Sequence, residues 1–232
     1  MSYLLRIKLP VICLVLFLLL SMSRYTAILA EEGTMRLLDS AAGKTFFDRL
    51  RNVQEDIRTL QARFVEERSV ASLKAPLHFE GKIYYNSEGM FFMEYNKPIN
   101  YIIRVKGKEA LFYVKGSHTV DVADVSAVKG VATHSDLLGM KLNRFKGQVW
   151  EGEQRYRLEE RAQENAGDSG GQHLTVFLNR KTLLVERVLI EDEYGEMTEI
   201  TLSDMQVNRE LPASVLQFTL PPGIKRNRLD NP

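Results

Sequence analysis

The stretch LHFEGKIYYN, residues 77–86, alternates apolar with polar side chains along most of its length. Its odd-numbered positions fall on one side of an extended chain, which is the pattern of a β-strand with a buried face. After turn residues at Ser87-Glu88-Gly89, the segment FFMEY, residues 91–95, keeps the same spacing. The two segments therefore predict an antiparallel hairpin.

Similar short segments recur along the chain, separated by turn residues such as Lys106-Gly107-Lys108 and Lys115-Gly116-Ser117. We expect roughly ten strands, the last of them over 216–223, where two prolines stop it. A single sheet of that size curls strongly. The predicted fold class is mainly β (α+β): an incomplete antiparallel β-barrel, or strongly curved sheet, with helices covering the concave face. A closed barrel is the alternative.

Two segments follow a helical period instead. Between residues 45 and 60, apolar side chains recur at spacings of four and three, which predicts an amphipathic helix with Thr45 as its N-cap. A weaker apolar stripe predicts a second, short helix over 135–145. Residues 31–44 are mostly small and charged, and we expect them to be frayed.

The first thirty residues have the order of a secretory signal peptide: basic residues, an apolar run over 11–20, and a small residue at Ala30. The run is about half the ~20 residues that a membrane-spanning helix needs, so we expect cleavage after Ala30 and not an uncleaved anchor. Residues 31–232 contain no linker and are expected to form a single domain. Since Cys13 is the only cysteine, that domain has no disulfide or thiolate chemistry.

Composition and motifs argue against several classes of function. The chain has 31 basic and 30 acidic residues, a balance that lacks the concentrated basic field of a nucleic-acid groove. None of the four histidines lies at a metal-ligand spacing, and neither a nucleophile elbow nor a phosphate-binding glycine loop occurs. We therefore predict that the protein is not an enzyme and has no metal site and no cofactor. One enzymatic alternative stays open, a pair of carboxylates for glycoside hydrolysis, because no sequence motif is needed to bring two acidic residues together.

The segment from Phe79 to Tyr101 is rich in aromatic and methionine side chains, and these occupy both faces of the predicted strands. Tyr84 and Phe92, for example, fall on the face opposite to Ile83. Large apolar groups on both faces need a cover on each side, or one face that lines a pocket. Two interpretations stay open: an ordinary packed core, or a cavity for a lipid, to which flexible methionines are suited.

Several short motifs then follow one another along the chain. Ala62-Arg63-Phe64-Val65-Glu66 comes after the first helix, and Gly81-x-Ile83-x-Tyr85 lies in the first strand. The remaining motifs are Phe91, Met93 and Tyr95 running to Pro98, the turn residue Gly107 before Tyr113, and a closing region with Leu202, Asn208, Leu211-Pro212, Phe218, Pro222 and Gly223. In this order and spacing, over nearly the whole mature chain, they resemble the LolA family of periplasmic lipoprotein carriers.

The resemblance implies an incomplete barrel whose helices form a lid over a hydrophobic interior. It implies a monomeric periplasmic carrier that takes acylated lipoproteins from an inner-membrane ABC transporter and delivers them to an outer-membrane receptor. Carriage of another lipid or glycolipid, or binding as an envelope-stress sensor, are the alternatives. The side chains expected to contact acyl chains are Phe79, Ile83, Tyr85, Phe91, Met93, Tyr95, Ile103, Phe112, Leu137, Leu138, Met140, Val176 and Leu178.

Three positions depart from the family pattern. The family's basic residue followed by proline, which is thought to hold the lid, is replaced by Asn86-Ser87-Glu88. The family's glutamine is Glu66, and its acid before the turn glycine is Lys106. The departures bear on the lid cycle and on the nature of the cargo more than on the fold.

Overall fold

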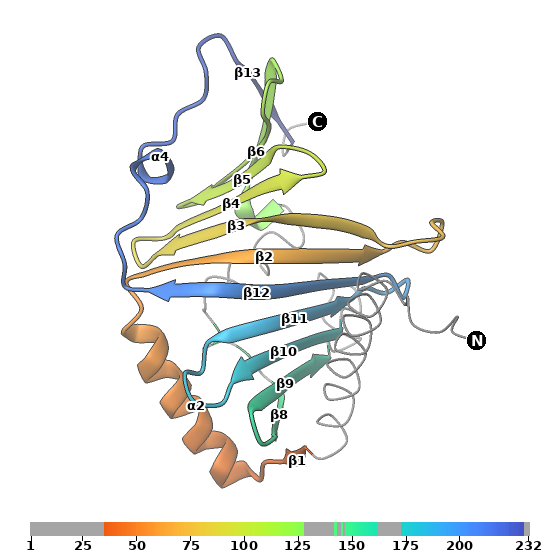
Figure 1. The fold of residues 1–232 in the computed structure, drawn as a ribbon, viewed down its shortest axis with the longest axis vertical. Coiled ribbons are helices and arrows are strands. Elements are labelled where there is room, and N and C mark those ends of the chain that lie inside the picture. Colours follow the sequence, from red (N-terminus) through yellow and green to blue (C-terminus); the bar gives the residue numbers. More distant parts are fainter. Residues whose placement is uncertain (1–34, 128–141, 143–144, 146, 162–172, 230–232) are drawn as a thin grey trace, which may run out of the picture.

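A computed structural model describes residues 35–127, 142, 145, 147–161 and 173–229, and in these ranges nearly all the secondary structure is strand. Figure 1 shows the strands stacked one above another, with helix α2 beside the lower ones. The elements are β1 (Arg36–Leu37), α2 (Ser40–Glu55), β2 (Thr59–Ser69), β3 (Leu77–Asn86), β4 (Met90–Lys97), β5 (Tyr101–Lys106), β6 (Glu109–Val114), β7 (Thr119–Asp124), η1 (Val125–Ala127), β8 (Gln148–Glu151), β9 (Arg155–Arg161), β10 (His173–Asn179), β11 (Val185–Glu191), β12 (Met197–Val207), α4 (Ala213–Leu216) and β13 (Lys225–Arg228).

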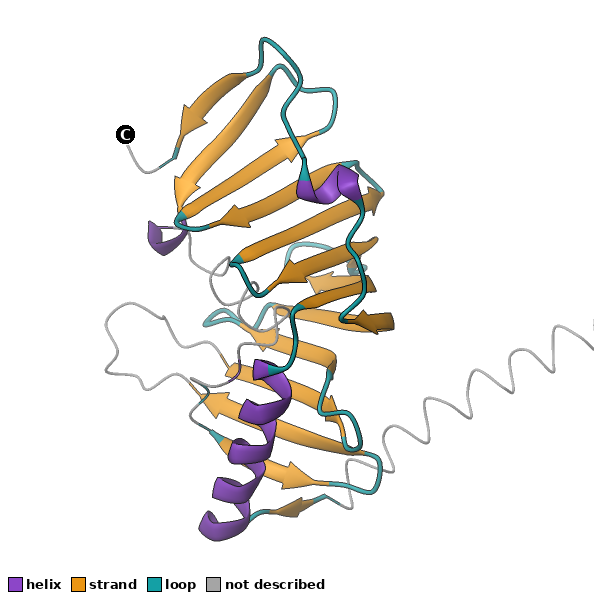
Figure 2. Ribbon diagram, turned by 90° about the vertical axis from the view of Figure 1, so that its left-hand side faces the viewer, coloured by secondary structure: helices purple, strands orange, loops and turns teal. Residues whose placement is uncertain are grey.

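All thirteen strands belong to one sheet, in the order β1-β8-β9-β10-β11-β12-β2-β3-β4-β5-β6-β7-β13. Neighbouring strands are antiparallel, except that β13 runs parallel to β7. The sheet is strongly curved and unclosed, because β1 at one end does not pair with β13 at the other (Figure 2). The predicted incomplete barrel is therefore confirmed, and the closed-barrel alternative is wrong.

Helix α2 begins earlier and ends earlier than the sequence predicted. Its N-cap is Asp39, whose carboxylate accepts a hydrogen bond from the backbone N–H of Ala42 at 2.9 Å. Thr45, the predicted cap, lies inside the helix, and residues 40–44 are helical where fraying was expected. The apolar spacing misled because Leu60, already in β2, is buried in the same core as the helix.

The C-terminal segment is the second correction. Residues 216–223 do not form a strand: the short helix α4 follows Pro212, and the last strand, β13, starts only at Lys225. Two prolines within 216–223 remove backbone donors, which explains why this stretch cannot join a ladder. The predicted short helix over 135–145 lies outside the described residues, apart from Leu142 and Phe145.

Five strands were missed in the sequence, namely β1, β2, β7, β8 and β13, while the predicted hairpin turns are confirmed. Gly89, Gly107 and Gly116 occupy turns with positive φ, which glycine adopts without strain. At 86–88, where the family motif is absent, the chain makes the β3–β4 turn. The Asn86 side chain accepts a hydrogen bond there from the backbone N–H of Met90 at 2.9 Å.

The buried apolar side chains form two clusters on opposite faces of the sheet. The larger one lies on the face that packs against Phe46 and Leu50 of α2, which we call the inner face. The smaller one, on the outer face, includes Tyr84 and Phe92 and is covered by the C-terminal segment 211–224. Apolar side chains on both faces of β3 and β4 are thus covered on each side, as the sequence required.

Candidate functional site

Ten of the thirteen side chains predicted to contact acyl chains lie in the described residues, and all ten belong to the inner-face cluster or pack against it. Register explains this convergence. Tyr85 pairs with Phe91, Ile83 with Met93, and Met93 in turn with Ile103, so that alternate residues of adjacent strands share one face. The three others, Leu137, Leu138 and Met140, lie outside the described residues.

Most of these side chains are already covered by the protein itself. Ile83 is 0% exposed and Met93 is 1% exposed, while Phe79, Ile103 and Phe112 are only partly buried. The inner face is therefore described in a closed form, in which protein side chains occupy the apolar surface. An apolar guest can bind there only by replacing some of those contacts.

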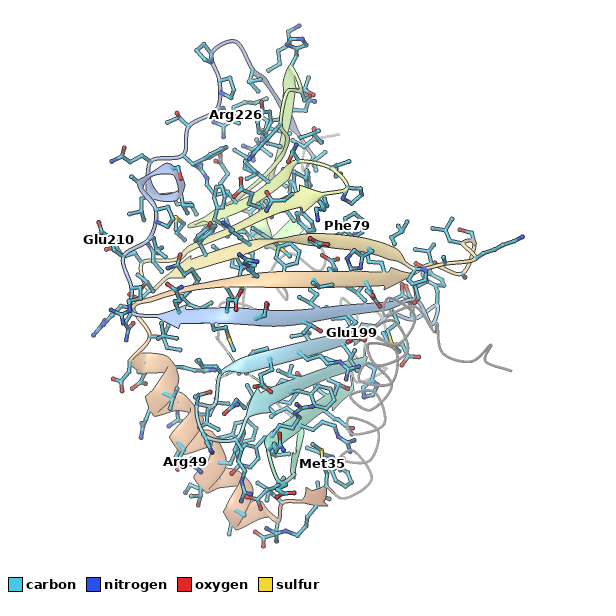
Figure 3. All side chains as sticks on the ribbon, in the orientation of Figure 1. Met35, Arg49, Phe79, Glu199, Glu210 and Arg226 are labelled. Atoms are coloured by element: carbon cyan, nitrogen blue, oxygen red, sulfur yellow. The ribbon has the colours of Figure 1, made fainter. Side chains whose placement is uncertain are left out.

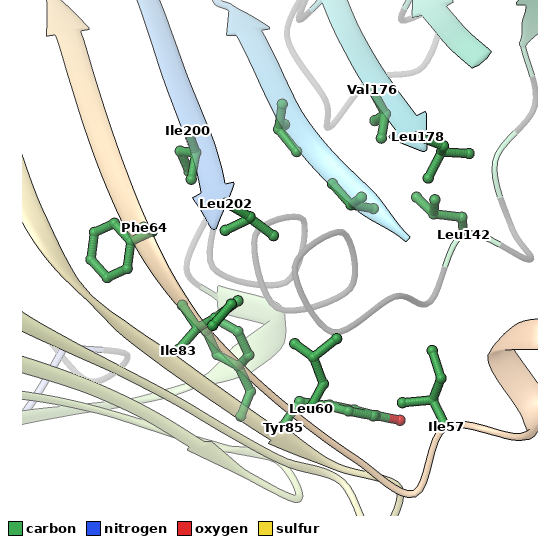
Figure 4. Packing of buried hydrophobic residues seen from close by; sticks show 14 of the residues in the cluster. Ile57, Leu60, Phe64, Ile83, Tyr85, Leu142, Val176, Leu178, Ile200 and Leu202 are labelled. Atoms are coloured by element: carbon green, nitrogen blue, oxygen red, sulfur yellow. The ribbon is translucent and has the colours of Figure 1, made fainter. Parts of the chain in front are cut away.

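Two elements supply part of this cover. Phe46 of α2 packs against Tyr156 of β9, with ring centroids 4.7 Å apart. Leu142, from the connection between β7 and β8, is 1% exposed and lies beside Leu178 (Figure 4). The sequence placed Leu142 on the weak apolar stripe of the predicted helix over 135–145, and the structure buries this side chain in the inner cluster.

One end of the inner face is polar. Glu66 follows Phe64 on β2 by two residues and so points to the same face, where its side chain is fully buried. Its carboxylate accepts a hydrogen bond from the Tyr95 hydroxyl at 2.7 Å and another from Nε of Arg68. The Arg68 guanidinium lies 5.0 Å from the ring centroid of Phe79, near the start of β3 (Figure 3).

Burial and nearby charge keep the two tyrosines of this region protonated. Burial, reinforced by the Glu66 carboxylate, raises the pKa of Tyr95 far above its usual range. Burial, together with the charge of Asp121, raises the pKa of Tyr101 to about 12. Both hydroxyls therefore remain hydrogen-bond donors at any physiological pH.

Sequence reasoning missed this polar end, although the signal was present. Glu66 was noted only as a departure from a family glutamine. The spacing Leu60, Ala62, Phe64, Glu66, Arg68 continues the alternation of a strand and places both charged residues on the apolar side. If the alternation is continued past the charged residues, it predicts both the strand β2 and the position of Glu66 and Arg68 on its apolar face.

The outer face offers a different kind of space. A cavity of about 510 Å³ lies there, lined by Arg63, Lys82, Tyr84 and Pro212 among others. Its lining mixes charged and aromatic groups, and Arg63 is paired with Asp204 at 3.3 Å. None of the predicted acyl-contacting residues lines this cavity.

Two further observations concern the described ranges only. Within them, no three histidine, acidic or cysteine side chains gather closely enough to hold a metal ion. Within the same ranges, no helix combines the length and apolar character needed to cross a membrane.

The family model of the outer membrane lipoprotein carrier protein LolA matches residues 55–219, which is most of the chain and nearly all of the sheet. The chain belongs to the LolA family. The resemblance noted in the sequence is thereby confirmed over β2 to β12 and the segment that follows.

Individual relatives of this LolA-family chain are distant. The outer-membrane lipoprotein carrier protein of Cupriavidus pinatubonensis is 22% identical over 184 residues, covering 76% of this chain and 84% of that protein. An uncharacterised conserved protein from Thermus thermophilus is 10% identical, with a TM-score of 0.49, covering 81% of this chain and 99% of that one. A LolA superfamily protein from Nitrosomonas europaea is 11% identical, with a TM-score of 0.40, covering 72% and 96%.

Proposed function

We propose that this LolA-family chain is a monomeric periplasmic carrier that holds the acyl chains of lipoproteins against its inner face. In this proposal the leader is cleaved after Ala30 and residues 31–232 form the single carrier domain. The carrier receives its cargo from an inner-membrane ABC transporter and releases it to an outer-membrane receptor. It performs no catalysis.

The observation that carries the proposal is the gathering of all ten described predicted residues on the apolar face against which α2 also packs, in a chain of this family. Each acyl CH₂ removed from water contributes about 0.8 kcal/mol, so an acyl chain leaves a membrane only for another apolar site. When an acyl chain replaces a protein side chain on the inner face, one apolar contact is replaced by another, so the net free energy of binding is small. Such binding is reversible, as release to a receptor requires.

The test is to purify the mature protein from its own periplasm and to identify bound molecules by native mass spectrometry and lipid extraction. Acylated proteins in the complex support the proposal. Free phospholipid or glycolipid without any acylated protein would identify a carrier of another lipid. A lipid-free protein that binds no hydrophobic probe would overturn acyl carriage and favour a sensor that binds a protein partner.

A matched pair of variants separates the cargo face from ordinary core. Ile83 on the inner face and Ile102 on the outer face are both almost fully buried. Ile83→Thr and Ile102→Thr should lower the free energy of unfolding by similar amounts, because each buries a hydroxyl. Only Ile83→Thr should weaken binding of a fluorescent fatty-acid probe, by several-fold. Equal loss of probe binding in both variants would contradict the assignment of the inner face.

A further inference from the structure

The polar end of the inner face combines a buried anion with a half-exposed cation. The Glu66 side chain is fully buried, whereas the Arg68 side chain is 44% exposed. Both residues lie on the face of β2 that carries Phe64. Next to them, Tyr95 belongs to the inner cluster and Phe79 packs against it. We call Glu66, Arg68, Tyr95 and Tyr101 the polar corner.

Stability alone gives little reason for such a pair. A buried carboxylate paired with a guanidinium generally contributes no more than apolar side chains of the same volume would. A purely structural pair would also be satisfied within the protein. Here the Glu66 carboxylate accepts one hydrogen bond from the Tyr95 hydroxyl and one from the Nε–H of Arg68, and the second of these orients the guanidinium.

The Arg68 guanidinium therefore keeps N–H donors that can bond to a ligand. Arginine carries five N–H groups, and the carboxylate of Glu66 takes the one on Nε. The guanidinium also interacts with the Tyr95 hydroxyl, which itself donates to Glu66. In the described part of the chain, no second carboxylate and no backbone carbonyl is bonded to the terminal amino groups of Arg68. Phe79 supports the plane of the guanidinium at 5.0 Å, so its orientation is fixed before any ligand arrives.

The neighbouring hydroxyls point to the same ligand chemistry. Tyr101 packs beside Tyr95, with ring centroids 5.7 Å apart, and both phenols stay protonated. A planar pair of guanidinium N–H groups matches the two oxygens of a phosphate, and the Tyr101 hydroxyl adds a further donor, whereas the Tyr95 hydroxyl already donates to Glu66. A few convergent polar groups at one end of an apolar surface are the usual means of fixing the orientation of an amphipathic ligand.

We propose that the polar corner binds the phosphate of a glycerophospholipid headgroup, while the acyl chains of the same molecule lie on the inner face. Anionic phospholipid would then be a second class of cargo, beyond lipoproteins. This inference rests on the acyl-binding part of the proposed function. It is specific about the end of the inner face at which the headgroup must lie, next to Arg68 and the start of β3.

The test compares three ligands by isothermal titration calorimetry on the mature protein: dioctanoyl phosphatidylglycerol, dioctanoylglycerol with the same chains but no headgroup, and inorganic phosphate. The native protein should bind the phospholipid about tenfold more tightly than the diacylglycerol, as charge-assisted hydrogen bonds to one phosphate allow. Inorganic phosphate alone should show no binding at millimolar concentration.

Three variants locate the effect. Arg68→Gln should remove the preference for phospholipid and leave the affinity for diacylglycerol unchanged. Because Arg68→Gln leaves Glu66 buried without its cation, the double variant E66Q/R68Q provides the same test with no unpaired charge. Arg63→Gln is the matched control, since Arg63 lies on the same strand but faces outward with its side chain 68% exposed. It should keep the full preference.

The outcomes are separable. Equal affinity of the native protein for both lipids, or a preference that survives in E66Q/R68Q, overturns the headgroup site while leaving acyl carriage intact. Failure to bind either lipid overturns acyl carriage and the headgroup site together. Phosphate that binds alone, as tightly as the phospholipid and only in the presence of Arg68, would identify a free-phosphate site and overturn the lipid interpretation.

Discussion

Gly81 lies where the ring of Phe64 and the backbone of β4 approach β3 most closely. A Cβ atom there would collide with the ring of Phe64 and with the carbonyl oxygen of Glu94. The carbonyl belongs to a paired strand and cannot move without breaking the ladder. The absence of a side chain at this position therefore lets the Phe64 ring pack over Gly81 on the inner face.

Gly81→Ala should accordingly lower the free energy of unfolding by about 1–3 kcal/mol, measured by urea denaturation. The control is Gly43→Ala in the first turn of α2, where a Cβ meets nothing within 4 Å. That change should stabilise the protein by up to about 1 kcal/mol, because alanine favours helix. Equal and small effects at both glycines would show that the approach at Gly81 is looser than described.

Tyr101 predicts how stability depends on alkaline pH. Burial and the charge of Asp121 raise its pKa to about 12, above the value of about 10 expected in the unfolded chain. Its contribution to stability is therefore complete below about pH 10 and is lost as the pH rises through about 12. Urea unfolding of the native protein and of Tyr101→Phe across this range should show a shallower decline in the variant. Parallel declines would exclude Tyr101 as the cause.

At the scale of elements, the two halves of the outer face are covered in different ways. The C-terminal segment covers β3 to β7 with Leu211, Val215 and Phe218. Over β8 to β11, arginine side chains cover the outer face. The Arg157 guanidinium carbon lies 4.9 Å from the ring centroid of Trp150, and that of Arg187 lies 5.2 Å from the ring centroid of Phe177. Long arginine stems cover apolar rings while their charges reach water and nearby glutamates.

Phe218→Ala tests the first of these covers. The ring contacts Phe92 at 5.3 Å between centroids and lies 5.6 Å from the Arg104 guanidinium. Its removal should cost about 1–3 kcal/mol of stability. Leu216→Ala, half-exposed two residues away, should change stability by less than about 0.5 kcal/mol. Both variants should bind a fatty-acid probe normally, and loss of binding in Phe218→Ala would move the cargo site to the outer face.

The same elements show what the sequence could and could not reveal. The inner-face residues of β3 to β5 and β10 were predictable, because strict alternation leaves only one way to share a face. β2 was missed because the charged residues Glu66 and Arg68 interrupt the apolar side of its alternation. The C-terminal segment was taken for a strand because Leu216, Phe218 and Leu220 alternate. Only tertiary structure shows that Phe218 and Leu220 lie against the outer cluster, whereas Leu216 is exposed.

At the scale of the whole molecule, α2 is tied to the sheet at both ends. Before the helix, the backbone N–H of Leu38 donates to the Val149 carbonyl of β8 at 2.9 Å. After it, the Asn208 side chain accepts from the N–H of Arg58 at 2.7 Å and donates to the Asp56 carbonyl at 2.9 Å. Between these anchors the helix is held by apolar packing alone in the described residues, mainly through Phe46 and Leu50.

Because the inner face is closed, the proposed acyl binding requires part of this packing to open, and we propose that α2 is the described element that moves. We therefore expect a covalent link between α2 and β9 to block uptake. The double variant Phe46→Cys/Tyr156→Cys replaces two rings whose centroids lie 4.7 Å apart, and residues 31–232 contain no other cysteine. Joining the two thiols with a short bifunctional maleimide should abolish uptake of a fatty-acid probe.

The same variant treated with a monofunctional maleimide carries similar bulk without the link and should still take up the probe. Unchanged uptake by the linked protein would mean that α2 stays in place while cargo enters, and that the opening lies elsewhere along the inner face.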